Sequence, residues 1–436
     1  MYKLSKFNYF CGNNKGELLL FNSYKGFHST CKVRDKELQK DILKLTELNE
    51  FVREKMLEKG IIVSTEEDEG LKLNHLICTA IAGNGLRLTI SPTEQCNFRC
   101  KYCYETHLNL VMSDKEKADL INYVKRNIHK HNSLHVSWFG GEPLLALDLI
   151  KELSGEFIKY CKMYRRQYSS IMTTNGYLLN LETAKMLVDY GVRLFQITID
   201  GVKEVHDNQR PLIGNQPTFD TIFNNLQKIK ESNIKNIRIV IRSNVTNDIF
   251  KYLDEYLDML IALCENDDRF SVSINHVAKW SDNIDKDFEE SFFEGLRGLS
   301  PIYQRILELK LKLKIVSPLN PIDSTCHLGK NNSFFIRPNG EVHKCTILYE
   351  DPNNIIGNLV NGDIVLNHKY YSRLSNPNTC PKLTDCFYAP LCKGEVCPST
   401  RGDKKKCPDS IFNLKYYLQL LDNYSEFELI DEYLEG

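Results

Sequence analysis

The chain has 436 residues, a formal net charge of −1 and 42% apolar residues. A chain of this length is too long to fold around one ordinary hydrophobic core, so two or three domains are expected. The balanced charge gives no sign of a nucleic-acid or membrane-surface partner. No apolar run is long enough to span a bilayer and residues 1–7 lack the layout of a signal peptide, which together predict a cytoplasmic protein.

Residues 1–84 are predicted to form a small N-terminal α+β module. Apolar residues flank a turn at 13–16, which indicates a β-hairpin. A leucine-rich apolar stripe predicts one helix over residues 36–59, followed by a short strand at 61–63. The acidic residues 66–69 are interpreted as a solvated linker.

Residues 85–315 alternate between strand and helix patterns. The predicted strands are 86–90, 134–139, 170–173, 194–199, 237–241 and 271–274, and the predicted helices are 115–129, 144–160, 182–190, 219–232 and 249–264. This alternation favours an α/β fold with a parallel sheet and crossover helices. Six units are too few for a closed eight-stranded barrel, so an open, partial barrel is expected. Ligands bind such sheets at the carboxyl ends of the strands.

Residues 316–436 are dense in cysteine, proline, glycine and asparagine, with little regular structure expected before a helix at 411–421. A segment with so few apolar residues needs staples such as bound metals. The chain has fifteen cysteines, and clustered cysteines in a cytosolic protein more often bind metal or perform chemistry than form disulfides.

Three cysteines lie on a short loop directly after the first strand of the α/β region. Cys96, Cys100 and Cys103 have the spacing C-x3-C-x2-C. Three thiolates can bind three irons of a [4Fe–4S] cluster, which normally has four cysteine ligands, so one iron is left open for a reacting molecule. The alternative is a zinc loop, although zinc usually takes paired C-x2-C units and four ligands.

This motif, with Tyr102 as the aromatic residue before the third cysteine, resembles the hallmark of the radical S-adenosylmethionine (SAM) family. The resemblance implies a partial (β/α)6 TIM-like barrel in which SAM chelates the open iron. It also implies that one electron cleaves SAM to methionine and a 5′-deoxyadenosyl radical, which takes a hydrogen atom from the substrate. A low-potential electron donor of the flavodoxin or ferredoxin type is the partner expected for this step.

Further motifs follow the next strands and resemble the SAM-binding motifs of this family. Two glycines after the second strand allow close approach of the backbone to a ligand, and the glutamate beside them can accept from an ammonium group. An Asn-Gly turn after the third strand suits either SAM binding or an ordinary turn. The residues expected to contact SAM are Tyr102, Gly140, Gly141, Glu142, Pro143, Thr173, Asn175, Thr198 and Arg210.

Residues 196–220 are similar to the branch of the family that carries a cysteine-rich C-terminal SPASM domain. That resemblance implies contacts to SAM from the Thr198 hydroxyl and from Arg210, whose planar fork suits a carboxylate. His206 and Asp207 could form an acid/base pair, but the favoured interpretation is that they hold the loop.

Seven cysteines after residue 325 resemble the SPASM domain, which houses two auxiliary iron–sulfur clusters. Cys380, Cys386, Cys392 and Cys407 would enclose one cluster, and Cys326, Cys345 and Cys397 would hold the other. The second set has three ligands unless another cysteine arrives, and an open auxiliary iron could bind a substrate thiolate. The spacings from 380 to 386 and from 392 to 397 depart from the family pattern. Two zinc sites are the alternative. Gly340 is predicted to turn a hairpin before Cys345.

The resemblance implies a peptide maturase that takes hydrogen from a ribosomally made precursor peptide and forms a thioether or other crosslink. Residues 1–84 resemble the winged-helix-like module that captures leader peptides by strand addition, although packing or dimerisation is an alternative role. One alternative function is an anaerobic sulfatase-maturing enzyme, which makes formylglycine. Those enzymes carry an aspartate after the second SPASM cysteine, whereas Thr346 follows Cys345 here. The other is a non-catalytic, zinc-stapled peptide-binding protein. The domains expected are 1–84, 85–315 and 316–436.

Overall fold

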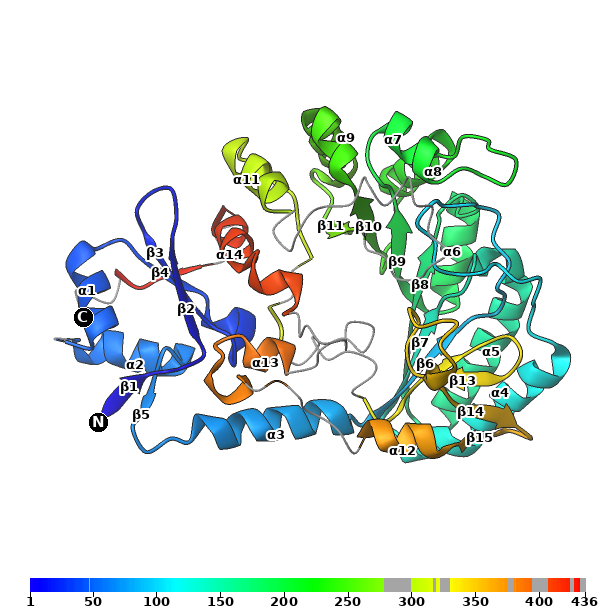
Figure 1. Ribbon diagram of the computed structural model, residues 1–436, viewed down its shortest axis with the longest axis horizontal. Coiled ribbons are helices and arrows are strands. Elements are labelled where there is room, and N and C mark those ends of the chain that lie inside the picture. Colours follow the sequence, from blue (N-terminus) through cyan, green and yellow to red (C-terminus); the bar gives the residue numbers. More distant parts are fainter. Residues whose placement is uncertain are drawn as a thin grey trace.

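The computed structural model describes residues 1–46, 48–277, 299–316, 319–321, 330–374, 380, 382–393, 407–423 and 427–431. Its centre is a run of six parallel strands that neighbour one another in chain order (Figure 1). They are β6 (Gly85–Ile90), β7 (Ser133–Trp138), β8 (Gln167–Thr174), β9 (Val192–Thr198), β10 (Arg238–Val245) and β11 (Phe270–His276). The predicted α/β fold with an open, six-stranded partial barrel is confirmed.

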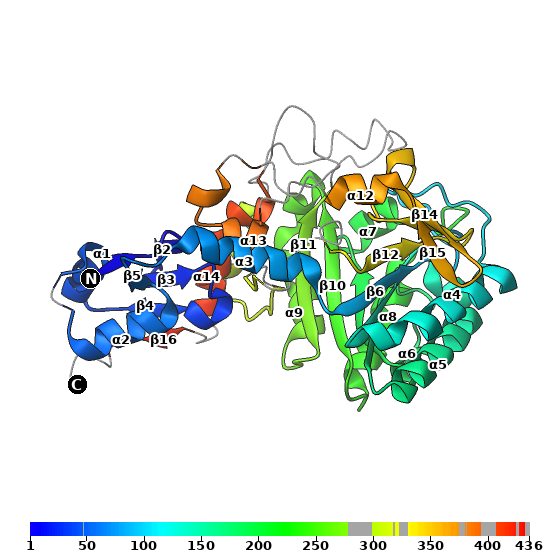
Figure 2. The same ribbon diagram turned by 90° about the horizontal axis from the view of Figure 1, so that it is seen from below.

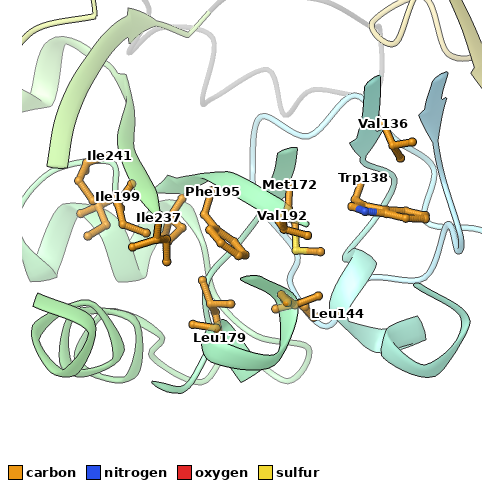
Figure 3. Close-up of a cluster of buried hydrophobic side chains, with 14 of the residues drawn as sticks. Val136, Trp138, Leu144, Met172, Leu179, Val192, Phe195, Ile199, Ile237 and Ile241 are labelled. Atoms are coloured by element: carbon orange, nitrogen blue, oxygen red, sulfur yellow. The ribbon is translucent and has the colours of Figure 1, made fainter. Parts of the chain in front are cut away.

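Helices cover the outer face of this sheet (Figures 1 and 2). They are α4 (Asp114–Asn127), α5 (Leu147–Met163), α6 (Leu181–Asp189), α8 (Phe219–Glu231) and α9 (Leu253–Cys264). The short helix α7 (Lys203–Gln209) follows the carboxyl end of β9. Trp138, Met172 and Phe195 point from the strands into the layer between sheet and helices and are fully buried (Figure 3). This apolar outer face leaves the inner face of the barrel for polar side chains.

The sheet continues beyond the six strands into the cysteine-rich region. β12 (Ser333–Ile336) pairs in parallel with β6, and β13 (Glu341–His343), β14 (Ile355–Val360) and β15 (Asp363–Leu366) extend the sheet antiparallel. Gly340 turns the β12–β13 hairpin with φ of 81°, as predicted. The expectation of little regular structure before residue 411 was wrong. The buried residues of β12 form a strand because they pair with β6, which lies almost 250 residues earlier in the chain.

The N-terminal module contains two small sheets. β1 (Tyr2–Leu4) pairs with β5 (Ile62–Ser64), while β2 (Asn8–Gly12), β3 (Leu18–Asn22) and β4 (Cys31–Val33) form an antiparallel meander. The β2–β3 hairpin confirms the predicted turn. β16 (Glu428–Leu429) adds to β4 in parallel, so the C-terminal segment closes this module (Figure 1).

One prediction for this module was wrong, and another was right only in part. The single helix over 36–59 is two helices, α1 (Lys36–Lys44) and α2 (Glu50–Lys59), because Leu45 adopts a left-handed conformation and Asn49 caps the second helix. The acidic stretch 66–69 is a linker only in part: residues 66 and 67 precede the helix, whereas Glu69 begins α3 (Glu69–Ala82), which runs from this module to the barrel (Figures 1 and 2). Asp68 caps α3, and the buried carboxylate of Glu69 accepts from the Ser5 hydroxyl.

Four helices come from the C-terminal part of the chain. They are α11 (Ser300–Glu308), α12 (His368–Leu374), α13 (Ala389–Cys392) and α14 (Leu414–Asn423), the last close to the predicted position. Leu414 and Leu418 of α14 pack with Leu19 and Phe21 of β3. The structure gives no helix, within the ranges it describes, that is long and apolar enough to cross a membrane.

Candidate functional site

A cavity of about 620 Å³ lies at the carboxyl ends of β7 to β11. The cysteine loop forms one wall, and segments from the C-terminal region form another. Besides the three cysteines of the loop, seven of the nine residues predicted to contact SAM line this cavity: Tyr102, Gly140, Gly141, Thr173, Asn175, Thr198 and Arg210. The structure therefore brings together residues that are more than 100 positions apart in the sequence.

The cysteine loop is clamped to the segment that carries Arg210. The backbone N–H groups of Arg99 and Lys101 donate to the carbonyls of Pro211 and Gln209, at 2.9 and 3.0 Å. Burial raises the pKa of the Cys96 thiol to about 12, and it also raises the pKa of Cys100 and of Cys103. Thiols in this environment ionise when a cation binds to them.

These three thiols fit an iron–sulfur cluster better than a single metal ion. They share one cavity, and besides burial Cys100 raises the pKa of both Cys96 and Cys103, so the three thiols lie close together. No three His, Cys, Asp or Glu side chains in the described part of the chain meet around a position for one ion. In a [4Fe–4S] cluster each thiolate binds a different iron, so its ligands stand apart around a shared space. Cys96, Cys100 and Cys103 would hold such a cluster.

A buried polar network joins the loop to the ends of β9 and β10. The Tyr102 hydroxyl donates to Asp200 Oδ2 and accepts from Arg210 Nη1. Asp200 Oδ1 accepts from the backbone N–H of Asn244 at 2.7 Å, and the Arg210 guanidinium lies 3.6 Å from Oδ2. Burial raises the pKa of Asp200, and the positive charge of Arg210 opposes that rise. The network fixes Arg210 against the cavity wall.

The two glycines after β7 line the cavity and also pack against the segment that leads into the cysteine loop. Gly141 N–H donates to Thr93 O at 3.2 Å, and a Cβ on Gly141 would lie 2.6 Å from Glu94 O and closer still to Gln95 O. Gly140 has φ of 111°, a conformation that favours glycine. The close approach predicted here is therefore first of all between two backbone segments.

Glu142 and Pro143 stand outside the set that lines the cavity. The fully buried Glu142 carboxylate accepts from the Thr174 hydroxyl and from the backbone N–H groups of Asn175 and Leu144, at 2.7 to 3.0 Å. These bonds hold the end of β8 in place. The predicted contact of Glu142 with the SAM ammonium stays a prediction.

His206 and Asp207 are arranged as a structural pair. His206 is fully buried, and its Nδ1 accepts from the backbone N–H of Asp200 at 3.2 Å. Burial, aided by Arg210, lowers the pKa of His206 well below its usual range. Asp207 accepts from the backbone N–H groups of Thr218 and Phe219 at the start of α8. This geometry agrees with the loop-holding interpretation.

The C-terminal cysteines fall into two places. Cys345 is buried, and Thr346 beside it lines the cavity. Burial raises the pKa of Tyr104 in the cysteine loop, and the nearby Cys345 adds a smaller contribution. Cys380 and Cys407 are close enough to raise the pKa of Cys386, after burial as the main cause. Cys392 packs in the same apolar cluster as Cys386. Cys326 and Cys397 lie outside the described residues.

Several cavity residues were missed from the sequence. Arg242 and Asn244 alternate along β10 and face the cavity, where Arg242 Nε donates to Asn244 Oδ1 at 2.9 Å. The sequence signal that could have identified them is the spacing of two residues between polar side chains at the end of a strand, which places both on one face. Glu105 also lines the cavity, and burial, followed by repulsion from Glu94, raises its pKa to about 8. Asp200, which is buried and bonds Tyr102 rather than lining the cavity, was also missed.

Comparisons with known proteins agree with this geometry. Residues 90–260 match the Radical SAM superfamily. A cysteine-type anaerobic sulfatase-maturating enzyme of Clostridium novyi is 26% identical over 348 residues, which cover 71% of this chain and 87% of that protein. The chain spans about half the length of other curated relatives. One of them, a GTP 3′,8-cyclase of Clostridium perfringens, is 32% identical over 186 residues, which cover 41% of this chain and 52% of that protein.

Two solved structures share the fold over most of the chain. anSMEcpe with bound AdoMet and Cp18Cys peptide has a TM-score of 0.59 and 19% identity, covering 78% of this chain and 97% of its own. Streptococcus suis SuiB bound to the precursor peptide SuiA has a TM-score of 0.52 and 15% identity, covering 94% and 99%. With the cysteine loop directly after the first strand of a six-stranded partial barrel, the family match shows that residues 90–260 form a radical SAM domain, and the chain is an enzyme that uses a [4Fe–4S] cluster and SAM.

Proposed function

We propose that this enzyme is a peptide maturase that takes hydrogen from a ribosomally made precursor peptide and forms a thioether or another crosslink. The observation that carries the proposal is the composition of the cavity wall. The cysteine loop and strand ends form one side, and Thr346, Ile347, Asn413 and Tyr417 from the C-terminal region form the other. A cavity built by both parts of the chain suits a substrate longer than a small metabolite. Two structures of this fold contain peptides.

The chain's own residues would bind and orient the cofactors. When bound, the cluster and SAM supply a 5′-deoxyadenosyl radical that removes a hydrogen atom from the substrate. Thr173, Asn175 and Thr198 present polar groups beside the cysteine loop and would hold SAM. Arg210, fixed by Tyr102 and Asp200, would pair with its carboxylate.

A thioether bond requires more than hydrogen abstraction. The substrate loses one hydrogen atom from carbon to the adenosyl radical and one proton from the thiol to solvent, and one further electron must leave. Cys345, together with Cys326 and Cys397, would hold an auxiliary site that receives this electron. Its support is the position of Cys345 near Tyr104 and the cavity. Cys380, Cys386, Cys392 and Cys407 would hold a second auxiliary site.

The N-terminal module is proposed to bind the leader of the precursor. A second cavity, of about 310 Å³, is lined by three consecutive residues of β5, Ile62, Val63 and Ser64, together with Tyr2 and Tyr24. Successive side chains of a strand point to opposite faces, so a cavity on one face would contact only alternate residues. A cavity that contacts three consecutive residues therefore runs along the edge of the strand. In the described part of the chain β5 pairs with β1 alone. An open strand edge beside a cavity is suited to strand addition.

Maturation of a sulfatase is the second candidate function. The similarity to the Clostridium novyi enzyme and to anSMEcpe supports it to the same degree as the fold supports crosslinking. Thr346 counts against it, because this residue stands after Cys345 and lines the cavity where an acid/base carboxylate is expected in those enzymes. A threonine hydroxyl does not act as a base near neutral pH.

The two functions are separated by their products. The reconstituted enzyme, SAM and a strong reductant would be incubated with cysteine-containing peptides encoded beside this chain, and separately with a cysteine-containing sulfatase peptide. We expect a precursor to lose two hydrogens and one alkylatable thiol, with the sulfatase peptide unchanged. Formylglycine in the sulfatase peptide, with every precursor unchanged, would establish the second function instead.

A further inference from the structure

His107 lies at the end of the cysteine loop and touches one of the three thiols. Its Nε2 is 3.3 Å from Cys103 Sγ, and the side chain lines the same cavity as the cysteines. The contact to Cys103 is the hydrogen bond that the imidazole makes in the described part of the chain. Because this bond is made by Nε2, the neutral imidazole can carry its proton on Nε2, directed toward the sulfur, and leave Nδ1 unprotonated.

The backbone fixes the place of His107. Its φ is 50°, in the left-handed region, which histidine, asparagine and aspartate adopt more often than other non-glycine residues. The segment after His107 is fixed, because Glu94 N–H donates to Leu110 O at 2.9 Å and Met112 N–H donates to Pro92 O at 2.9 Å. This loop keeps the imidazole beside Cys103.

We propose that His107 is a positioning residue of the first cluster, whose Nε2–H donates a hydrogen bond to the Cys103 thiolate and raises the reduction potential of the cluster. Hydrogen bonds to ligand sulfurs are among the factors that set the potential of an iron–sulfur cluster. The donor withdraws charge from sulfur and so favours the reduced, more negative state. Cys96, by comparison, receives a backbone N–H from Phe98 at 3.4 Å. The inference concerns the cluster alone and does not depend on the peptide substrate.

The test compares two amides that differ by one methylene group. In His107→Gln the amide nitrogen can reach the position of Nε2, whereas in His107→Asn it cannot. Asn also tolerates the left-handed backbone, so this variant removes the contact without adding strain. Leu108→Ala is the control on the same loop, since Leu108 is 44% exposed.

The measurement is a redox titration of the reconstituted enzyme followed by EPR, using the signal that changes on addition of SAM. For His107→Asn we expect the ratio of reduced to oxidised cluster at a fixed potential to fall about tenfold, which is about 59 mV for one electron. His107→Gln and Leu108→Ala should match the wild type, and all variants should cleave SAM with a strong reductant.

Two results would overturn the proposal. One is an unchanged potential in His107→Asn at full iron content. The other is a nitrogen hyperfine coupling that shows the imidazole bound directly to iron.

Discussion

Replacing Gly141 by alanine is expected to prevent the cysteine loop from holding the first cluster. The new Cβ would lie 2.6 Å from the carbonyl oxygen of Glu94 and closer to that of Gln95. Both are backbone atoms that lead directly into Cys96, so the strain cannot be relieved by rotating a side chain. Forcing atoms into a packed site typically costs about 1–3 kcal/mol. Here the segment that gives way carries the cluster ligands.

The readouts for Gly141→Ala are iron content and thermal unfolding. We expect a loss of about four irons per chain, the content of one [4Fe–4S] cluster, and a lower unfolding temperature. Gly155→Ala is the matched control: its added Cβ meets only Tyr190 at 3.9 Å, and it lies inside α5. Alanine there should stabilise the helix by about 0.5–1 kcal/mol. Full iron content in Gly141→Ala would contradict the packing described here.

Asp200→Ala is expected to destabilise the protein by about 3–5 kcal/mol, because it leaves the buried Arg210 guanidinium without its carboxylate. Asp200 is fully buried, and it also accepts from Tyr102 and from the backbone of Asn244. Since Arg210 lines the cavity, the same change should weaken SAM binding. Chemical unfolding and the KM for SAM are the two measurements.

Two further variants make the Asp200 test specific. Asp220→Ala removes a surface carboxylate that pairs with Lys203, with a side chain 62% exposed, and should change stability by about 0–1 kcal/mol. Tyr102→Phe combined with Asp200→Ala should cost less than the sum of the single changes, because both remove the same network. Additive effects, or an unchanged KM for SAM, would show that the network does not position Arg210.

The partial barrel could be predicted from the sequence because each strand and helix is a local pattern. Parallel strands buried against helices appear as short apolar runs, and five crossover helices carry clear apolar stripes. The cysteine loop was equally accessible, since its three ligands lie within eight residues. Its position after β6 followed from the order of the elements.

The features that were missed depend on contacts between distant segments. β12 is a short run whose partner, β6, is almost 250 residues away, and no local pattern reveals that pairing. The contacts of the Glu142 carboxylate with Thr174, at the end of β8, and with the backbone of Asn175 also join segments more than 30 residues apart, which the sequence position of Glu142 does not reveal. Glu69 was assigned to a linker because acidic residues are common both in exposed linkers and at the first turn of a helix.

Formation of 5′-deoxyadenosine from SAM is the most direct test of the radical SAM chemistry at Cys96, Cys100 and Cys103. The anaerobically reconstituted protein would be compared with a variant in which these three cysteines are alanine, under a strong reductant. The wild type should bind about twelve irons and release 5′-deoxyadenosine and methionine, whereas the variant should retain about eight irons and release neither. A wild type that holds its irons yet forms no 5′-deoxyadenosine, or a variant that forms as much as the wild type, would contradict the assignment.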